Sequence, residues 1–139
     1  MTAPTARDQR SGCPISIALE LLGDAWSLLI VRDLMFKERR TYKDFLEGGE
    51  GIASNILADR LRRLEAAAIV RKQRDPADAR SFVYRLTAKG IDLAPVLVEL
   101  VIWSARHEVT DAPPSVVKTM RNDRTGFIAD VRKRWQAGA

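Results

Sequence analysis

The sequence predicts a mostly α-helical chain that carries one small β-hairpin. Apolar residues recur at helical spacing through most of the chain, whereas the segment from Val70 to Leu86 alternates in part between apolar and polar residues around a turn-rich centre. Eight Lys and Arg stand against three Asp and Glu between Arg60 and Arg85, and the net of +5 equals the charge of the whole chain. The basic surplus therefore falls on one predicted helix and the hairpin after it.

Length and composition predict one main domain with an appendage. The 139 residues are 46% hydrophobic and 29% charged, which is ordinary for a globular protein. We expect a flexible N-terminal arm over residues 1–12, a folded domain over 13–110 and a helical extension over 111–139. The first residues lack the apolar core of a signal peptide, and the apolar runs are too short to span a membrane. A single cysteine agrees with a reducing compartment, so we expect a cytoplasmic protein with no membrane partner.

Two helices are predicted in the first quarter of the chain. Ile15, Leu19 and Leu22 lie at i, i+4 and i+7 and form one helical face, and Gly23 ends this helix at a position that favours positive φ. A second helix follows at once, and its apolar side consists of Trp26, Leu29, Ile30 and Leu34. We expect these two helices to support the segment that follows them.

A pair of shorter helices is predicted from Thr41 onward. Thr41 is placed to cap the first of them, and a glycine-rich loop over residues 48–51 ends it. Ser54 is placed to cap the second. The buried stripe of this second helix is predicted at helical spacing to be Leu57, Leu61 and Leu64.

Two short helices followed by a hairpin make the plan of a winged helix-turn-helix domain. Val70–Arg74 and Ser81–Leu86 are the predicted strands, and Asp75–Arg80 is expected to form a long basic tip. A basic surplus confined to the second helix and the hairpin is the pattern expected for a surface that grips phosphates. Double-stranded DNA is therefore the predicted partner.

The second helix of this pair would present one face to a DNA groove. Helical geometry places Asn55, Asp59 and Arg62 away from the leucine stripe, with Ala58 and Arg63 flanking them, and Ser54 at the start of the helix is expected to contact DNA as well. Asn pairs with adenine and Arg with guanine in the major groove, although phosphate contact and a merely solvated face remain alternatives. Asp59 would repel phosphate, so it either accepts from a cytosine amino group or orients Arg62 or Arg63, and orientation is the favoured alternative.

Further phosphate contacts are predicted around this helix and along the hairpin. The residues expected to make them are Arg39, Arg40, Lys43, Arg71, Lys72 and Arg74. Arg80, at the tip, is expected to enter a minor groove or to pair with Asp78, and the two roles are compatible.

A long apolar helix is predicted after the hairpin. Thr87 caps it, and Pro95 is expected to kink it by removing one backbone donor. Only Pro95 and Glu99 are not apolar within Leu93–Trp103, so this helix is too apolar for one side to face water. We expect one face to fill the chain's own core and the other to form a homodimer. The predicted interface residues are Leu93, Leu97, Leu100, Val101 and Trp103.

Five segments of the sequence form a recognisable set. They are Cys13–Pro14, Leu22–Leu34, Ile56–Glu65, Tyr84–Gly90 and Leu93–Leu97. Together they resemble the HxlR-type bacterial transcriptional regulators, relatives of the MarR regulators, over about residues 13–103. The resemblance implies a dimeric winged-helix repressor or activator that binds operator DNA near the genes it controls. It also implies that the helix over 54–67 enters the major groove and that the hairpin over 70–86 is the wing.

Two features depart from the commoner pattern of that family. The tip at Asp75–Arg80 looks more like a MarR wing than like the shorter, proline-rich tip of many HxlR proteins. The chain also extends past the usual domain, with a linker at Asp111–Ser115 and a helical stretch over Val116–Trp135 that is interrupted near Asn122. We leave two roles open for this extension, namely dimer contacts and the wall of a ligand site.

Two kinds of signal are candidates to control the protein. Some members of the family use a cysteine at this place as a redox or electrophile sensor, which makes Cys13 a candidate sensor. Its position at a helix N-terminus favours the thiolate, but the nearest basic residues, Arg7 and Arg10, lie in the predicted arm, so a passive thiol is the competing interpretation. A small-molecule effector is the other candidate. Its pocket would lie at the dimer interface and could be lined by Trp26, Trp103 and Trp135, with Tyr42 and Phe127, although core packing is the simpler account.

The sequence predicts neither a catalytic site nor a metal site. One His and one Cys offer no nucleophile with a base and an orienting third group, so no catalytic residue and no cofactor are expected. His107 has no ligand cluster at metal spacing. The sequence thus predicts a homodimeric regulator, a repressor in its expected role, that binds a pseudo-palindromic operator and responds to a small molecule or to thiol chemistry. Two alternatives stay open, a winged helix that docks proteins and an architectural DNA binder without sequence preference.

Overall fold

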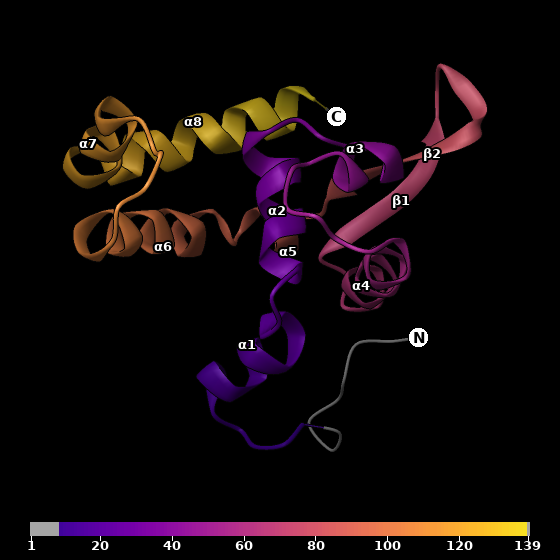
Figure 1. The fold of residues 1–139 in the computed structure, drawn as a ribbon, viewed down its shortest axis with the longest axis horizontal. Coiled ribbons are helices and arrows are strands. Elements are labelled where there is room, and N and C mark those ends of the chain that lie inside the picture. The colour runs from indigo at the N-terminus through magenta and orange to yellow at the C-terminus, as the bar shows by residue number, and fades with distance from the viewer. Residues whose placement is uncertain (1–8, 139) are drawn as a thin grey trace. The chain divides into compact units, whose positions relative to one another are not determined.

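The computed structural model describes residues 9–138 and divides the chain into two compact units (Figure 1). The first unit ends at Gly90 and the second begins at Ile91. The described residues are mostly helical and include one two-stranded antiparallel sheet, which confirms the predicted fold class, a mostly α winged helix-turn-helix chain with a small β-hairpin. The division falls inside the predicted domain over 13–110. Residues 1–8 of the predicted arm lie outside the described part of the chain.

Helices and strands follow the predicted order. The first unit holds α1 (Pro14–Leu22), α2 (Ser27–Phe36), α3 (Tyr42–Leu46), α4 (Ser54–Ala66), β1 (Val70–Asp75) and β2 (Asp78–Leu86). The short helix α5 (Ala88–Ile91) lies at the division between the units. The second unit holds α6 (Ala94–His107), α7 (Pro114–Asn122) and α8 (Arg124–Ala137). Within residues 9–138 no single helix is long and apolar enough to cross a membrane, and α1 with α2 reaches that hydropathy only as a pair bent by 81°.

The core of the first unit forms around the leucine stripe of α4. The side chains at its three predicted positions are buried, as are residues of α2 and the hairpin that pack around them. Burial of one such leucine contributes about 2 kcal/mol relative to leaving it exposed. The buried residues are Leu57, Leu61 and Leu64 of α4, Ile30 and Val31 of α2, and Val70 and Leu86 of the hairpin. The predicted stripe is therefore confirmed, and it fixes which face of α4 remains outside.

Helix α1 forms where its periodicity predicts, but its apolar face is exposed. Ile15 is 71% exposed, Leu19 is exposed as well, and α1 holds no buried residue. Gly23 ends the helix with φ −83°, so the expectation of a positive φ there is wrong. Glycine is required for another reason: a Cβ at this position would lie 2.3 Å from the carbonyl oxygen of Leu19.

The two helices of the helix-turn-helix begin differently. The Thr41 side chain accepts a hydrogen bond from the backbone N–H of Asp44, whose carboxylate in turn accepts from the backbone N–H of Thr41, so the predicted cap is confirmed as a full capping box. The predicted Ser54 cap is wrong. Ala53 holds the cap position with extended backbone, and Ser54 is already the first helical residue.

The hairpin is tighter than the sequence suggests. Its strands pair from Val70 opposite Leu86 to Asp75 opposite Asp78, with an irregularity after Arg74. Only residues 76 and 77 separate the two strands, so the predicted long tip over 75–80 is wrong. The Asp75 carboxylate accepts from the backbone N–H of Ala77, and this local bond favours the short turn over an open loop.

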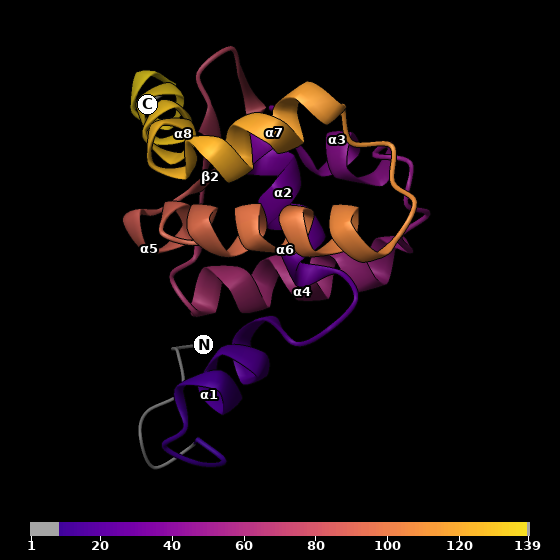
Figure 2. The same ribbon diagram turned by 90° about the vertical axis from the view of Figure 1, so that its left-hand side faces the viewer.

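The second unit is a set of three helices with its own core. Helix α7 lies alongside α6 after the connecting loop, and α8 contacts both (Figure 2). The core consists of Val98, Ile102 and Met120, with Val101, Phe127 and Ile128 packed against it. Asp123 separates α7 from α8 and caps α8 by accepting from the backbone N–H of Gly126, which confirms an interruption near Asn122.

The predicted kink at Pro95 is wrong. Residues 92 and 93 form a turn between α5 and α6, and Pro95 lies in the first turn of α6. A proline there removes no intrahelical hydrogen bond, because the first N–H groups of a helix have no helical acceptor. Pro95 therefore begins a new helix instead of bending a continuous one.

Candidate nucleic-acid interface

The outer face of α4 carries the side chains expected to meet DNA. Ser54, Asn55, Arg62 and Arg63 are exposed, while Ala58 and Asp59 between them are partly buried. The polar and basic side chains thus point away from the leucine stripe, as helical periodicity requires.

Asp59 is the common partner of three arginines. Its Oδ2 lies 3.1 Å from Nε of Arg63 and also pairs with Nη1 of Arg60, and its Oδ1 lies 3.8 Å from Nη2 of Arg62. These ion pairs restrict the rotamers of two exposed guanidinium groups on the outer face of α4. Asp59 therefore lies within ion-pair distance of all three arginines.

A tyrosine fixes the start of α4. The Tyr42 hydroxyl of α3 donates a hydrogen bond of 2.6 Å to the backbone carbonyl of Ser54. The first turn of α4 is therefore tied to the preceding helix as well as packed against it. Sequence reasoning missed this bond, because nothing local to either residue reveals a partner in the other helix.

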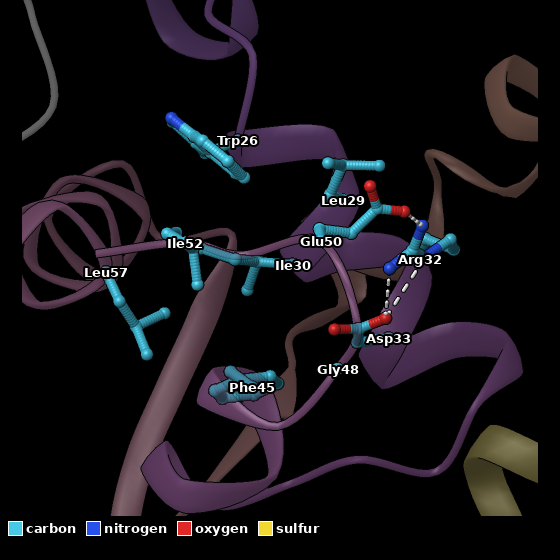
Figure 3. A pocket seen from close by; sticks show the side chains of 10 residues that line it. All are labelled: Trp26, Leu29, Ile30, Arg32, Asp33, Phe45, Gly48, Glu50, Ile52 and Leu57. Carbon is cyan, nitrogen blue, oxygen red and sulfur yellow. Dashed lines mark hydrogen bonds and ion pairs between the residues drawn. The ribbon is translucent and has the colours of Figure 1, made fainter. Parts of the chain in front are cut away.

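A buried carboxylate holds the turn between α3 and α4 (Figure 3). Asp33 is 5% exposed, and its Oδ1 accepts hydrogen bonds from Nε and Nη2 of Arg32 and from Nη1 of Arg39 at 2.8–3.0 Å. Arg32 also donates to Glu50 in the turn, at 2.8 Å. A Cβ at Gly48 would lie 3.3 Å from both Asp33 and Arg39, which favours glycine there. The structure thus places Arg39, a predicted phosphate contact, on an internal carboxylate.

The cavity beside this network is too small for an organic effector. Trp26, Ile30, Phe45 and Ile52 supply much of its apolar lining (Figure 3). Its volume of about 20 Å³ is close to the space that one water molecule needs. Trp26 therefore lines a small recess, and this recess offers no room for the effector considered from the sequence.

One face of the wing stacks two cations on an aromatic ring. Lys72 Nζ lies 4.3 Å from the ring centroid of Phe82, and Arg74 Cζ lies 5.1 Å from it. Arg74 is opposite Phe82 in the strand register and also donates to the carbonyl of Ala79. Phe82 was not predicted as a functional residue, although a correct register would have placed it beside Arg74. The ring holds both cations on the wing surface.

The other face of the wing gathers like charges. Arg71 lies directly opposite Arg85 in the register, and the carbonyl of Arg40 accepts from the backbone N–H of Tyr84, the neighbour of Arg85. Burial lowers the pKa of the Arg85 guanidinium, and the charges of Arg71 and Arg40 lower it further. Like charges opposite each other destabilise a strand pair, so an anion bound here would relieve their repulsion. Arg85 is a basic residue that the predicted contacts omitted.

The remaining predicted basic residues are exposed. Arg80 at the end of the hairpin lies 3.5 Å from Oδ1 of Asp78 through its Nε, and its side chain is almost fully in solvent. The pair with Asp78 that the sequence suggested is therefore present. Lys43 of α3 is exposed as well.

Helix α6 keeps an exposed apolar stripe despite its partners in the second unit. Val96, Leu100 and Trp103 are exposed at i, i+4 and i+7, and Trp103 reaches 60%. Among the other predicted interface residues, Leu97 is already buried within the chain, and Val101 and Leu93 are partly covered. The apolar surface left for a partner thus includes Val96, which the sequence argument did not select.

Cys13 lies at the N-terminus of α1 and is exposed. Its carbonyl accepts from the backbone N–H of Ile17. The side chain of Arg10 is directed to Ser16 and Glu20 instead of to the thiol. Among the described residues, no three His, Cys, Asp or Glu side chains lie together as a metal site would require.

Comparison with known proteins identifies the architecture. The HxlR-like helix-turn-helix family matches residues 21–111. The chain belongs to this family. It is accordingly a DNA-binding transcriptional regulator of the helix-turn-helix type found in bacteria.

Two relatives of this HxlR-like chain show how far the likeness extends. The HTH-type regulator YodB of Bacillus subtilis is 37% identical over 93 residues, which cover 66% of this chain and 82% of YodB. The HTH-type regulator sll1512 of Synechocystis is 35% identical over 88 residues, which cover 63% of this chain. The match spans 64% of the length of that Synechocystis relative.

Solved structures agree with the HxlR-like fold. PA1607 matches with a TM-score of 0.68 and 33% identity over 76% of this chain and 72% of PA1607. The reduced form of YodB matches with a TM-score of 0.58 and 34% identity over 68% of this chain and 93% of YodB. YodB has also been solved after diamide treatment and with a bound quinone, and these forms match with TM-scores of 0.54 and 0.55.

Proposed function

We propose that this HxlR-like protein is a sequence-specific repressor that binds a pseudo-palindromic operator as a homodimer. The observation that carries the proposal is the outer face of α4, where Asp59 forms ion pairs with Arg62 and Arg63 and Asn55 is exposed. A face built only for phosphates would gain nothing from a carboxylate in its centre, because Asp59 reduces the net positive charge. Oriented guanidinium groups suit base edges, which need a defined geometry.

In this proposal α4 enters the major groove and the wing grips the backbone. Asn55, Arg62 and Arg63 meet base edges, while Ser54 and Ala58 allow close approach of the helix. The phosphate contacts are assigned to Arg40, Lys43, Arg71, Lys72 and Arg74, with Arg80 at a minor groove. Arg39 is assigned to Asp33, which its guanidinium already contacts. Two copies would place their α4 helices about one helical turn apart, so the operator would have two half-sites.

The homodimer is proposed to bury the two exposed apolar stripes. Ile15 and Leu19 form the stripe of α1, and Val96, Leu100 and Trp103 form that of α6. Exposed apolar faces of this kind mark interaction surfaces, and a second copy supplies the same surfaces for a closed two-fold contact. Leu100→Glu should increase the monomer fraction measured by sedimentation velocity. Val109→Glu is the control, because Val109 is fully exposed but follows α6; an equal effect of both changes would contradict the interface.

Control by thiol chemistry or by a small molecule is the last part of the proposal. YodB, a relative at 37% identity, has been solved in reduced, diamide-treated and quinone-bound forms, which supports such control here. With one cysteine in the chain, a disulfide must join two copies: two Cys13 thiols would give two protons and two electrons to the oxidant and form one S–S bond. Diamide should then release DNA from the wild type and leave Cys13→Ser bound. Release from both proteins would remove Cys13 as the sensor.

The decisive experiment compares DNA fragments. Fluorescence anisotropy over a salt series would measure binding to duplex from upstream of the protein's own gene and to random duplex. A preference of about 10³ or more at physiological salt would establish an operator. Equal and steeply salt-dependent binding to both duplexes would favour an architectural DNA binder. An absence of binding at low salt would favour a protein-docking module instead.

A further inference from the structure

The carboxylate of Asp24 lies between α1 and α2 and caps the second of these helices. Its Oδ1 accepts hydrogen bonds from the backbone N–H groups of Trp26 and Ser27 at 2.7 and 2.9 Å, and its Oδ2 accepts from the Ser27 hydroxyl. Burial alone would raise the pKa of Asp24, but the hydrogen bonds from Ser27 and Trp26, with a contribution from Arg60, outweigh it and hold the pKa below its ordinary value. Asp24 is therefore charged at neutral pH.

Arg60 of α4 lies between Asp24 and Asp59. Its side chain is only 17% exposed, Nε is 3.2 Å from Oδ1 of Asp24, and Nη1 pairs with Oδ2 of Asp59. The Nε–H is not aligned for a hydrogen bond to Asp24, whose Oδ1 already accepts two. Among the described residues, Arg60 Nε is the buried side-chain donor that has no hydrogen-bond partner. Charge attraction, and not a hydrogen bond, therefore links Arg60 to Asp24.

The same oxygen of Asp59 serves two arginines. Oδ2 pairs with Arg60 on the inner side and with Nε of Arg63 on the outer side. An arginine free to turn would compete for both carboxylate oxygens in the bidentate geometry that guanidinium and carboxylate groups prefer. Asp24 opposes this by attracting Arg60 from its other end. Whether Asp59 pairs mainly with Arg60 or also with Arg63 thus depends on the charge of Asp24.

We propose that Asp24 is a positioning residue for base reading, and that its charge acts through Arg60 to keep Asp59 available for the outer arginines of α4. The inference rests on the proposed sequence-specific function and adds a residue outside the helix-turn-helix to it. Alternating charges connect the α1–α2 junction to the DNA-facing side of α4 in the order Asp24, Arg60, Asp59, and then Arg62 and Arg63. Asp24 itself touches no DNA in this arrangement.

Asp24→Asn removes the negative charge but keeps an oxygen that can cap α2. The asparagine oxygen can still accept from the N–H groups of Trp26 and Ser27, but it no longer attracts Arg60. The probe is the tightest-binding duplex that the full-length wild type selects from a randomised library, measured against random duplex at one salt concentration. Asp24→Asn should weaken binding to the selected duplex about fivefold to tenfold and leave random duplex within about twofold, because coupled ion pairs interact by amounts of this order.

Ser27→Ala is the matched control. It removes the hydroxyl bond to the same carboxylate and leaves both the charge of Asp24 and its contact with Arg60. Its thermal unfolding temperature should fall while its preference for the selected duplex stays at the wild-type value. Arg60→Gln removes the competitor for Asp59, so its preference for the selected duplex should stay near the wild-type value, and Asp24→Asn should cause no further loss in the Arg60→Gln background, because Asp24 acts only through Arg60.

The outcomes separate the inference from the function on which it rests. A wild-type preference that persists in Asp24→Asn overturns the inference and leaves the proposed function standing. An equal loss of preference in Asp24→Asn and Ser27→Ala, or a loss that Asp24→Asn still causes in the Arg60→Gln background, also overturns it, because Asp24 would then act without Arg60. A wild type that binds every duplex equally overturns the proposed function and the inference together.

Discussion

The basic residues of α4 and those of the wing are organised in opposite ways. On α4 the carboxylate of Asp59 pairs with Arg62 and Arg63 and lowers the net positive charge of the helix face. On the wing Arg71 lies opposite Arg85, and a ring carries Lys72 and Arg74. Orientation is favoured on the helix and net charge on the wing. This difference fits two tasks, because bases must be read with defined geometry while phosphates need only positive charge.

The largest expected effect is on the wing. The double variant Arg71→Ala/Arg74→Ala should weaken binding to every duplex alike, by about 50-fold at physiological salt, and reduce the slope of log K against log salt by about 2, since each phosphate contact releases roughly one counterion. Anisotropy titrations at several salt concentrations measure both quantities. Gln73→Ala, a neutral change between the two arginines, is the control. An unchanged slope would contradict the phosphate assignment.

A smaller and more selective effect is expected on α4. Arg62→Ala should weaken binding to the selected duplex about tenfold and change random duplex little, because a base contact discriminates by about 1–3 kcal/mol. Competition titrations with duplexes that carry single base changes would then show relaxed preference at one position of each half-site. If the selected and random duplexes weaken by the same factor, Arg62 contacts phosphate, and the contrast between helix and wing loses its main support.

Phe82 allows the wing to be tested without changing its charge. Phe82→Leu removes the ring beneath Lys72 and Arg74, so binding should weaken about threefold for all duplexes, as expected for a cation–π contact worth about 0.5–1 kcal/mol. The salt slope should stay at the wild-type value because the cations remain. Phe82→Tyr keeps the ring and should bind like the wild type. A lower slope in Phe82→Leu would show that the ring determines the number of phosphate contacts, and not only how firmly the Lys72 and Arg74 side chains are held.

The smallest effect concerns Asp44 in the capping box of α3. Hydrogen bonds from the backbone N–H of Arg40, and then from Thr41, hold the pKa of Asp44 below its ordinary value of 3.8, although burial opposes them. A lowered pKa in the folded state means that this stabilisation is complete above pH 3.8 and is lost as the pH falls below it. Urea unfolding between pH 5 and pH 3 should therefore show a steeper loss of stability for the wild type than for Asp44→Asn. Parallel curves would remove Asp44 as a source of acid sensitivity.

The sequence alone determined the features that depend on local spacing. The leucine stripe of α4, the capping box at Thr41 and the interruption between α7 and α8 follow from residues within a few positions of one another, and the structure has all three. The concentration of basic charge on one helix and one hairpin is also a property of the chain itself. These features suffice for the fold class, whereas the family was indicated by the five segments that resemble the HxlR-type regulators.

Only the tertiary structure decided which charged groups meet. The contacts of Asp24 with Arg60, of Asp33 with Arg39 and of Tyr42 with Ser54 join different elements, and the opposition of Arg71 and Arg85 depends on the strand register. The wrong predictions of a cap at Ser54 and of a kink at Pro95 had the same origin. Where each helix begins depends on where the chain must turn to pack. Periodicity states which face of an element is apolar, whereas an ion pair needs the distance between two side chains, and that distance is set by packing.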